Sequence, residues 1–412
     1  MISINESIPS AFVTRKKNIL ISCMALTVGG GEILPMSLAA ELSKNNQVFL
    51  FYHMDLDEDE GLVKRLIPKE VKVLSMKRVH FLHFFAKNIH SLLRSMNIRW
   101  SAYDFFRLRL LDYYVRKYSI DIISSHSMIS DEACCQLFYK KKPVIVTEHG
   151  QYVQHIAKGI KSFVGYLKRA TKIIAVSNYN RKLLLNELND VPVEVETIYN
   201  GIKREEMSVG DFRKDHGISD DTFVFGMVSR GIPEKGWKFA IESFLKLKSE
   251  TSKKTLLVLV GGSMYLDELK ERYTNEASIV FVGSVPNPSY YVKGFDIGLL
   301  PTVYEAESFP LAIIEYLFEE KPVIATDTGG IREMLCDDKI EAGRLIQLQE
   351  SECLFKENIS LAMKEYMVNE ALYKDHRVNT AKLAQRFTIE ECSRNYEKLF
   401  DEILDSPSSR KT

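Results

Sequence analysis

The sequence predicts an α/β protein made of two doubly wound domains, each with a parallel sheet covered by helices on both faces. Its 412 residues exceed one ordinary hydrophobic core, so two domains of about 200 residues are expected. Short apolar runs alternate with helical patterns along the chain, which is typical of βαβ units. A turn at Tyr199-Asn200-Gly201 and the polar run after it divide this alternation. We therefore expect domains at 1–202 and 203–386, followed by a helix and tail at 387–412.

The first series begins with a strand, a glycine loop and an amphipathic helix, the opening of a doubly wound domain. Gly29, Gly30 and Gly31 form the loop. They do not make a GxGxxG fingerprint, and no acidic residue ends the second strand as NAD binding would require. The glycines either let a ligand approach the backbone or only make a tight turn. The expected strands are Asn18–Met24, Gln47–Tyr52, Asp121–Ser125, Pro143–Thr147, Lys172–Val176 and Val193–Ile198.

The second series has the same alternation, so it predicts a second parallel sheet with both faces covered. From Glu350 to about Leu404 the pattern is helical, and Phe387–Asp405 is expected to form one amphipathic helix. The expected strands are Thr222–Val228, Thr255–Val260, Ser278–Val282, Phe295–Leu300 and Pro322–Ala325.

Composition narrows the class of protein. The 55 basic and 55 acidic residues cancel, which gives no overall reason to expect a nucleic-acid partner. The six cysteines show no metal-binding spacing and are typical of reduced cytosolic thiols. The first twenty residues lack the uncharged apolar core of a signal peptide, and no run reaches the length of a membrane span. We expect a cytoplasmic location, with contact to the inner face of the cell membrane left open.

Charged residues follow strands in both series. Glu148-His149-Gly150 comes after a strand, at the carboxyl end where open α/β sheets bind ligands. His149 is therefore either a ligand contact or an ordinary structural histidine. Arg230 and Lys235 flank a glycine–proline turn, with a helix expected from about Lys235. Two cations beside a helix N-terminus would hold a diphosphate; the alternative is a pair of exposed basic residues.

A second anion-binding feature is expected at Pro310, which is predicted to open a short apolar helix because proline is tolerated in a first helical turn. The N–H groups of Phe309, Leu311 and Ala312 would then point out of the helix end and attract an anion. Small residues recur where other strands of this series end. They are Gly262, Gly283, Ser284 and the run Thr326–Gly330.

Glu307 and Glu315 lie on either side of this helix end. Carboxylates near an anion site need hydroxyls to accept from, and a sugar and a ribose would supply them. The alternative is that Glu307 is a solvated loop residue and Glu315 a polar position on a packed helix. Two glutamates at a fixed spacing are a weak signal when they are taken alone.

Taken together, these motifs resemble the retaining glycosyltransferases of the GT-B fold, family 4 of the glycosyltransferase classification. The resemblance runs through both domains and is strongest from Ser229 to Leu335. It rests on the Glu-x7-Glu pair, the Arg–Lys pair, the TGG-x-x-E motif and the turn between domains. In this sequence they are Glu307 and Glu315, Arg230 and Lys235, Thr328–Glu333, and Tyr199-Asn200-Gly201.

The resemblance implies a role for each site residue. Arg230 and Lys235 would neutralise the donor diphosphate, helped by backbone N–H groups at Phe309 and Leu311. Glu307 would hold hydroxyls of the donor sugar and Glu315 those of the ribose, so that neither is the nucleophile. His149 would touch the transferring sugar. The remaining positions implied at the donor site or along the cleft are Pro310, Gly262, Gly283, Ser284 and the loop Gly29, Gly30 and Gly31.

The same resemblance implies an acceptor-side first domain, a donor-binding second domain and a last helix that crosses back to the first. The implied reaction moves a sugar from a UDP- or GDP-linked donor to a glycan or lipid-linked acceptor in cell-surface polysaccharide or glycolipid synthesis. It implies no metal and no cofactor, so the acidic run DLDED at 55–59 is expected to be a surface loop. The nucleobase, the sugar and the acceptor stay open.

Residues 76–118 match none of these motifs. Nine Lys/Arg and two Asp are interleaved with aromatic side chains, which is typical of helices that lie on anionic lipid. The alternative is a pair of ordinary domain helices with basic side chains at their edges.

Two other functions remain open from the sequence alone. A nucleotide-sugar epimerase of the same fold would need an acid–base carboxylate on the first domain, for which Glu148 is the obvious candidate. A non-catalytic protein that only binds a sugar nucleotide would keep the donor residues without turnover.

Overall fold

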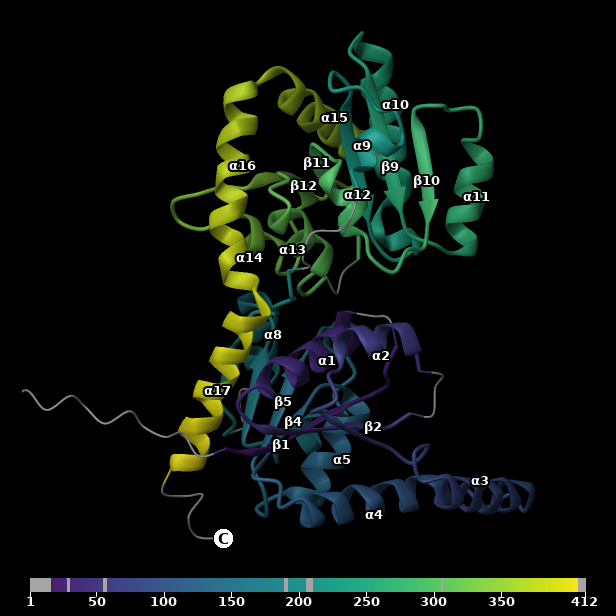
Figure 1. The fold of residues 1–412 in the computed structure, drawn as a ribbon, viewed down its shortest axis with the longest axis vertical. Coiled ribbons are helices and arrows are strands. Elements are labelled where there is room, and N and C mark those ends of the chain that lie inside the picture. Colours follow the sequence, from purple (N-terminus) through teal and green to yellow (C-terminus); the bar gives the residue numbers. More distant parts are fainter. Residues whose placement is uncertain are drawn as a thin grey trace, which may run out of the picture.

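The computed structural model describes residues 16–27, 30–54, 58–188, 192–204, 210–304 and 307–406. These residues form two parallel sheets, one above the other in Figure 1, and the α16–α17 segment runs along one side of both. Helices pack on both faces of each sheet, so the chain has the predicted two doubly wound domains.

The first sheet has seven strands in the order β3-β2-β1-β4-β5-β6-β7, and every neighbouring pair is parallel. Its strands are β1 (Asn18–Cys23), β2 (Gln47–Tyr52), β3 (Lys72–Leu74), β4 (Ile122–Ser125), β5 (Val144–Glu148), β6 (Lys172–Ala175) and β7 (Val195–Thr197). The helices between and after them are α1 (Gly30–Leu42), α2 (Glu60–Leu66), α3 (His80–Ser95), α4 (Ala102–Lys117), α5 (Met128–Phe138), α6 (Gln151–Ala157), α7 (Val164–Leu167) and α8 (Asn178–Glu187).

The second sheet has six parallel strands in the order β10-β9-β8-β11-β12-β13. They are β8 (Phe223–Val228), β9 (Thr255–Val260), β10 (Ile279–Gly283), β11 (Ile297–Leu300), β12 (Val323–Thr326) and β13 (Gly343–Ile346). The accompanying helices are α9 (Phe212–Asp215), η1 (Pro233–Lys235), α10 (Trp237–Glu250), α11 (Met264–Arg272), α12 (Ser289–Lys293), α13 (Leu311–Phe318), α14 (Ile331–Leu335), α15 (Glu352–Val368), α16 (Glu370–Ala384), η2 (Gln385–Phe387) and α17 (Ile389–Asp405).

Each sheet contains one strand more than the sequence predicts. β3 has three residues, of which only Leu74 is buried, and β13 has only two buried residues among its four. Neither is long or apolar enough to give an alternating pattern. The sequence does predict the other strands, with ends that differ by one or two residues.

The last helix belongs to the core of the first domain, as expected. Cys392, Tyr396 and Phe400 of α17 pack with β1, β2 and α1 in one hydrophobic cluster. The Tyr396 hydroxyl lies 2.8 Å from Thr147 Oγ1 of β5. The chain therefore passes between the domains twice, once after β7 and once before α17.

The two connections between the domains touch each other. Ile202 pairs with Thr388, and the N–H of Ile389 donates to the carbonyl of Ile202 at 3.0 Å. A Cβ atom on Gly201 would lie 2.2 Å from the Thr388 carbonyl oxygen, so only glycine fits there. The boundary predicted at residue 202 lies between the end of β7 and the start of β8.

Candidate active site

The carboxyl ends of the strands in the two sheets face each other across the domain interface. Asn180, which follows β6, donates through Nδ2 to Ser308 Oγ at 2.9 Å, and Ser308 follows β11 in the other domain. A Cβ atom on Gly330 would lie 2.9 Å from Ser177 Cβ of the first domain. Parallel α/β sheets bind ligands at this edge, so the predicted site residues must be located relative to it.

Glu333 joins the domains directly. Its carboxylate accepts the N–H groups of Asn178 and Tyr179 at 2.8 and 2.7 Å and the hydroxyl of Tyr199 at 3.1 Å. The first two donors open α8, so a carboxylate of the second domain satisfies a helix N-terminus of the first. The last residue of the TGG-x-x-E motif is therefore an interdomain contact in this structure.

Lys235 and Glu307 form a buried ion pair at the centre of the donor-side loops. Lys235 Nζ lies 2.6 Å from Glu307 Oε2, and the two side chains are 7% and 6% exposed. The ammonium also lies 5.2 Å from the ring centroid of Tyr304, a cation–π arrangement. We assigned these two residues to different parts of the donor, whereas the structure pairs them with each other.

Backbone geometry places Lys235 in this position. β8 and β11 are neighbours in the sheet, so the loops that follow them lie side by side. The carbonyl of Glu234 accepts the N–H of Val303 at 2.8 Å and the hydroxyl of Thr302 at 3.1 Å. Gly236 then turns the chain into α10 with a φ of +85°, where a Cβ atom would lie 1.9 Å from the Pro301 carbonyl oxygen. The helix starts at Trp237, after a 3-10 turn that ends at Lys235.

The loop after β12 supports Glu307 from the other side. The N–H of Gly330 donates to the Glu307 carbonyl at 3.2 Å. A Cβ atom on Gly329, whose φ is +58°, would lie 1.6 Å from the same carbonyl oxygen. The glycines of the TGG motif thus let one backbone approach another rather than approach a ligand.

The helix that follows Glu307 starts one residue later than the sequence predicts. α13 begins at Leu311, and Pro310 is the N-cap residue, with φ −70° and ψ 119°. Its first-turn N–H groups at Leu311 and Ala312 have no acceptor within the helix by geometry. The Phe309 side chain is 6% exposed and stacks on Tyr199, with ring centroids 5.3 Å apart. Because this side chain is buried, only the backbone N–H of Phe309 can take the predicted role at the donor.

Three of the other predicted donor residues, Gly262, Gly283 and Ser284, lie where β9 and β10 end. The N–H of Gly261 donates to the carbonyl of Gly283 at 3.0 Å, and Gly283 has a φ of +87°. A Cβ atom on Gly262 would lie 2.9 Å from Ser284 Cβ. Glu315 is half-buried on α13.

Arg230 is exposed on the loop after β8 and faces the first domain. Its guanidinium acts on Glu32 in the first turn of α1: burial raises the pKa of the Glu32 carboxyl, and its own backbone N–H and Arg230 oppose that rise. We did not predict Glu32 as a site residue, although it directly follows the glycine loop. Gly30 and Gly31 lie within the first turn of α1, and Gly29 lies outside the described residues.

His149 lies on the first domain beside α1, because a Cβ atom on Gly31 would be 3.7 Å from His149 Cβ. Its Nε2 lies 3.1 Å from His126 Nδ1, and His126 Nε2 lies 2.9 Å from Ser124 Oγ. His149 Nδ1 is buried without a hydrogen-bond partner among the described residues. Burial lowers the pKa of His149 to about 4, so the ring is neutral at pH 7.

Glu148 serves a structural purpose. It is 1% exposed and accepts the N–H groups of Gly150, Tyr152 and Val153 at 2.7, 3.1 and 3.2 Å. These donors open α6, so the carboxylate caps that helix. Burial raises the pKa of Glu148 to about 7, and the backbone donors oppose the rise. A buried carboxylate that already accepts three backbone N–H groups does not fit the acid–base role that an epimerase needs.

Within the described parts of the chain, no group of three or more His, Cys, Asp or Glu side chains could hold a metal ion. Asp59 caps α2 by accepting the N–H of Leu62 at 2.9 Å. Asp55 and Asp57 lie outside the described residues. The expected metal independence stays a prediction.

Two family models together match most of the chain. Residues 28–206 match the model described as "Glycosyltransferase Family 4", and residues 208–380 match "Glycosyl transferases group 1". The second match contains all six strands of the second sheet, and the first contains every strand of the first sheet except β1.

Curated relatives of the chain include two bacterial enzymes. The Escherichia coli UDP-Gal:alpha-D-GlcNAc-diphosphoundecaprenol alpha-1,3-galactosyltransferase is 26% identical over 61% of this chain and 67% of its own length. The Staphylococcus aureus capsular polysaccharide biosynthesis glycosyltransferase CapM is 30% identical over 47% of this chain and 54% of its own. Other curated relatives are matched over 52% and 44% of their length, about half in each case.

A solved structure of the same fold is Anabaena HepE in complex with UDP and glucose. The similarity covers 94% of this chain and all of that chain, with a TM-score of 0.70 and 18% sequence identity. At this identity the likeness shows the fold alone.

Proposed function

Since this chain belongs to glycosyltransferase family 4 and has the GT-B fold, we propose that it moves a sugar from a nucleotide-diphosphate sugar to a glycan or lipid-linked acceptor, with retention of anomeric configuration. The observation that carries the proposal is the buried Lys235–Glu307 pair beside the N-terminus of α13. The E. coli relative uses a UDP-linked donor and a lipid-diphosphate acceptor by its name.

The donor diphosphate would bind where the positive groups meet. Arg230 is exposed and can form paired hydrogen bonds with phosphate oxygens. The first-turn N–H groups of α13 add the partial positive charge of a helix N-terminus. Both are in place before the glycosidic bond breaks, so they would stabilise the charge that develops on the leaving diphosphate.

The buried ion pair changes the role that we assign to Lys235. Because Glu307 already offsets its charge, Lys235 contributes less net positive charge to the diphosphate than an unpaired lysine would. It fixes one oxygen of Glu307 and leaves the other for hydroxyls of the donor sugar. A carboxylate held in this way is a poor nucleophile, and this supports a mechanism without a covalent glycosyl–enzyme intermediate.

On the facing domain, His149 would contact the transferring sugar. Its neutral ring brings no second charge into the site, and its buried Nδ1 still needs a partner. A sugar hydroxyl would satisfy that atom. Metal ions would not be required, because Arg230, Lys235 and the end of α13 supply the positive charge.

The first experiment separates donor binding from transfer. UDP, GDP and their sugar derivatives are screened by thermal shift, since a ligand that binds the folded state raises the melting temperature. The donor so identified is then incubated with a lipid-linked acceptor extract, and the anomeric proton of the product is assigned by NMR. We expect metal-independent transfer with the donor's own configuration, whereas an inverted product would refute retention.

Two controls address the alternative functions. Incubation of the donor without acceptor would convert the sugar if the protein were an epimerase, and we expect no conversion. A nucleoside diphosphate that raises the melting temperature without any transfer to any acceptor would instead support a protein that only binds sugar nucleotides.

A further inference from the structure

The helix α3 leaves most of its surface uncovered. It packs against α4 along one narrow face, and among its sixteen residues only Ala86 is buried. Figure 1 shows α3 extending past the rest of the first domain, at the end remote from the second domain. Within the described residues, no helix is long and apolar enough to cross a membrane.

The uncovered face of α3 is apolar. Phe81, Phe84 and Phe85 are 82%, 69% and 45% exposed, and Leu92 and Met96 are 60% and 61% exposed. Their spacing places all five on one side of the helix. We call these five residues the α3 apolar face. Monomeric soluble proteins rarely expose a contiguous apolar surface of this kind unless it binds something.

Aromatic side chains continue this surface toward α4. Trp100 and Phe105 are 51% and 39% exposed, and their ring centroids lie 5.5 Å apart. Phe85 and Phe106 make an edge contact at 5.8 Å. A tryptophan at the margin of an apolar helix face is typical of side chains that sit at the boundary between lipid headgroups and acyl chains.

The surroundings of the α3 apolar face are strongly positive. Residues 76–118 contain nine Lys/Arg and two Asp, an excess of seven positive charges. Both aspartates are engaged: Asp104 pairs with Arg107 and Asp112 with Arg116. The other basic residues on the two helices and the loop between them are Lys87, Arg94, Arg99, Arg109 and Lys117.

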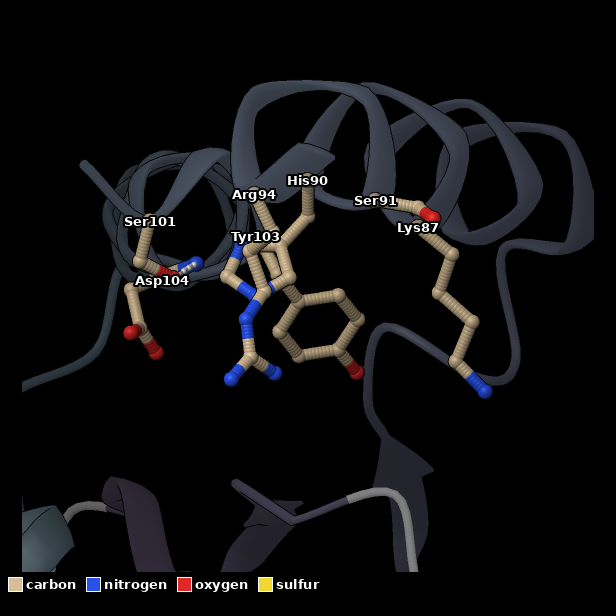
Figure 2. Close-up of a pocket in the computed structure, with 7 residues that line it drawn as sticks. All are labelled: Lys87, His90, Ser91, Arg94, Ser101, Tyr103 and Asp104. Carbon is tan, nitrogen blue, oxygen red and sulfur yellow. Dashed lines mark hydrogen bonds between the residues drawn. The ribbon is translucent and has the colours of Figure 1, made fainter. Parts of the chain in front are cut away.

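A groove of about 460 Å³ lies between α3 and α4. Figure 2 shows the ends of Lys87, Arg94 and Tyr103 directed to the same side of the helix pair. The groove is completed by His90, Ser91, Ser101 and Asp104. Cations and hydroxyls of this kind suit a phosphate group next to an apolar surface.

We propose that α3 lies in the headgroup region of a membrane that contains anionic lipid, with the α3 apolar face toward the acyl chains and Lys87 and Arg94 on lipid phosphates. The combination of an aromatic helix face with a positive flank favours anionic lipid over a neutral protein partner. Docking of this kind would hold the domain where a lipid-linked acceptor is located. This last step rests on the proposed function, whereas lipid binding does not.

The test is flotation of the full chain with vesicles of phosphatidylcholine alone or with about one third phosphatidylglycerol. We expect the protein to float with the anionic vesicles and to be released by high salt, because the electrostatic part of binding is screened. No sugar donor or acceptor is present. A failure here therefore says nothing against the proposed transfer reaction, and a failure of transfer says nothing against lipid binding.

Matched variants locate the surface. The triple change Phe81→Ser, Phe84→Ser and Leu92→Ser should lower binding by about tenfold or more. Its control is Met264→Ser, Val368→Ser and Leu361→Ser on the second domain, where the exposed fractions of 81%, 69% and 51% are similar. The control should bind as the unaltered protein does. Because all six side chains are exposed, both variants should keep the melting temperature of the parent.

A second pair of variants tests the positive flank. Lys87→Gln with Arg94→Gln should weaken binding to anionic vesicles by about tenfold, since each basic residue near the surface contributes separately. The control Lys214→Gln changes an 85% exposed lysine on the second domain and should have no effect.

Three results would overturn the proposal. They are unaltered flotation of the Phe81/Phe84/Leu92 variant, no flotation of the parent with anionic vesicles at low salt, and a concentration-dependent dimer that the same variant abolishes. The last result would assign the α3 apolar face to a second copy of the chain.

Discussion

Lys235 Nζ lies 2.6 Å from Glu307 Oε2 in a buried position, although the two residues are 72 positions apart in the chain. One residue lies in the loop after β8 and the other in the loop after β11, so the pair joins two adjacent strand ends of the second domain. A buried ion pair costs desolvation energy that its attraction only partly returns. The presence of this ion pair in a glycosyltransferase is therefore better explained by a role in function than by a role in stability.

Breaking this pair should destabilise the second domain. Lys235→Gln and Glu307→Gln each leave a buried group unpaired, and we expect each to lower the free energy of unfolding by about 3 kcal/mol. The double variant should lose less than the sum, because neither charge then remains. Denaturant unfolding measures all three. If the loss in the double variant equalled the sum of the two single losses, the two side chains would not interact in solution.

Arg230 should act on the reaction without acting on stability, because it is exposed. Arg230→Gln should lower kcat by about 10²- to 10³-fold if it stabilises the leaving diphosphate, with an unchanged melting temperature. Lys238→Gln is the control, since that lysine lies close by on α10 and pairs with Glu242 and Glu352. If kcat fell equally in the two variants, Arg230 would act through its general positive charge and not through a specific contact with the diphosphate.

His126 should fix the proton of His149. The hydrogen-bond roles of these three groups are coupled, because a neutral imidazole has one donor nitrogen and one acceptor nitrogen. Donation from Ser124 to His126 Nε2 leaves the His126 proton on Nδ1, which donates to His149 Nε2. His149 then carries its own proton on Nδ1. We expect ¹⁵N NMR to show this tautomer.

A pair of His126 variants gives the kinetic counterpart. His126→Phe removes the donor to His149 and should lower kcat more than it changes KM for the sugar nucleotide. His126→Asn keeps an N–H near the same place and should restore part of the activity. If both variants lose activity equally, the contact between the two rings does not matter for turnover.

Glu148 should make stability depend on pH. Its folded-state pKa is raised to about 7 from an ordinary value of 4.5. The folded state therefore binds the proton more tightly than the unfolded state, and this contribution is fully present below pH 4.5 and lost as pH rises through 7. Four backbone N–H groups within residues 149–153 oppose this rise, and the Glu148 charge in turn helps to raise the pKa of the buried Asp131.

Glu148→Gln removes that dependence. Because Gln stays neutral at every pH, the parent should lose stability relative to the variant between pH 5 and pH 8, by an amount on the order of a few kcal/mol in free energy. Glu132→Gln, on the exposed side of α5, should show a constant difference. A constant difference for Glu148→Gln would show that the carboxylate is ionised throughout this range in both the folded and the unfolded state.

The sequence was most informative where a motif sits at the end of a strand. The apolar runs locate eleven strands because buried parallel strands are continuously hydrophobic, and the glycine, arginine and glutamate positions follow from those ends. The fold, the family and the placement of Arg230 and Glu307 on one domain could all be predicted in this way.

Contacts between distant loops could not be predicted. Nothing in the sequence shows that Lys235 and Glu307 neutralise each other, or that Glu333 caps α8 of the other domain, because both depend on how strand ends meet in space. Glu32 was missed for the same reason. The sequence did mark residues 76–118 as unusual, but only the exposed fractions show that α3 leaves one apolar face uncovered.

The crossing of the chain at Gly201 and Thr388 has a mechanical consequence. Both covalent connections between the domains pass through this one place, and the rings of Tyr199, Phe309 and Phe387 pack beside it. Any rotation of one domain against the other must therefore take place about this crossing of the two connections. Residues beside this crossing move least in such a rotation, and residues far from it move most.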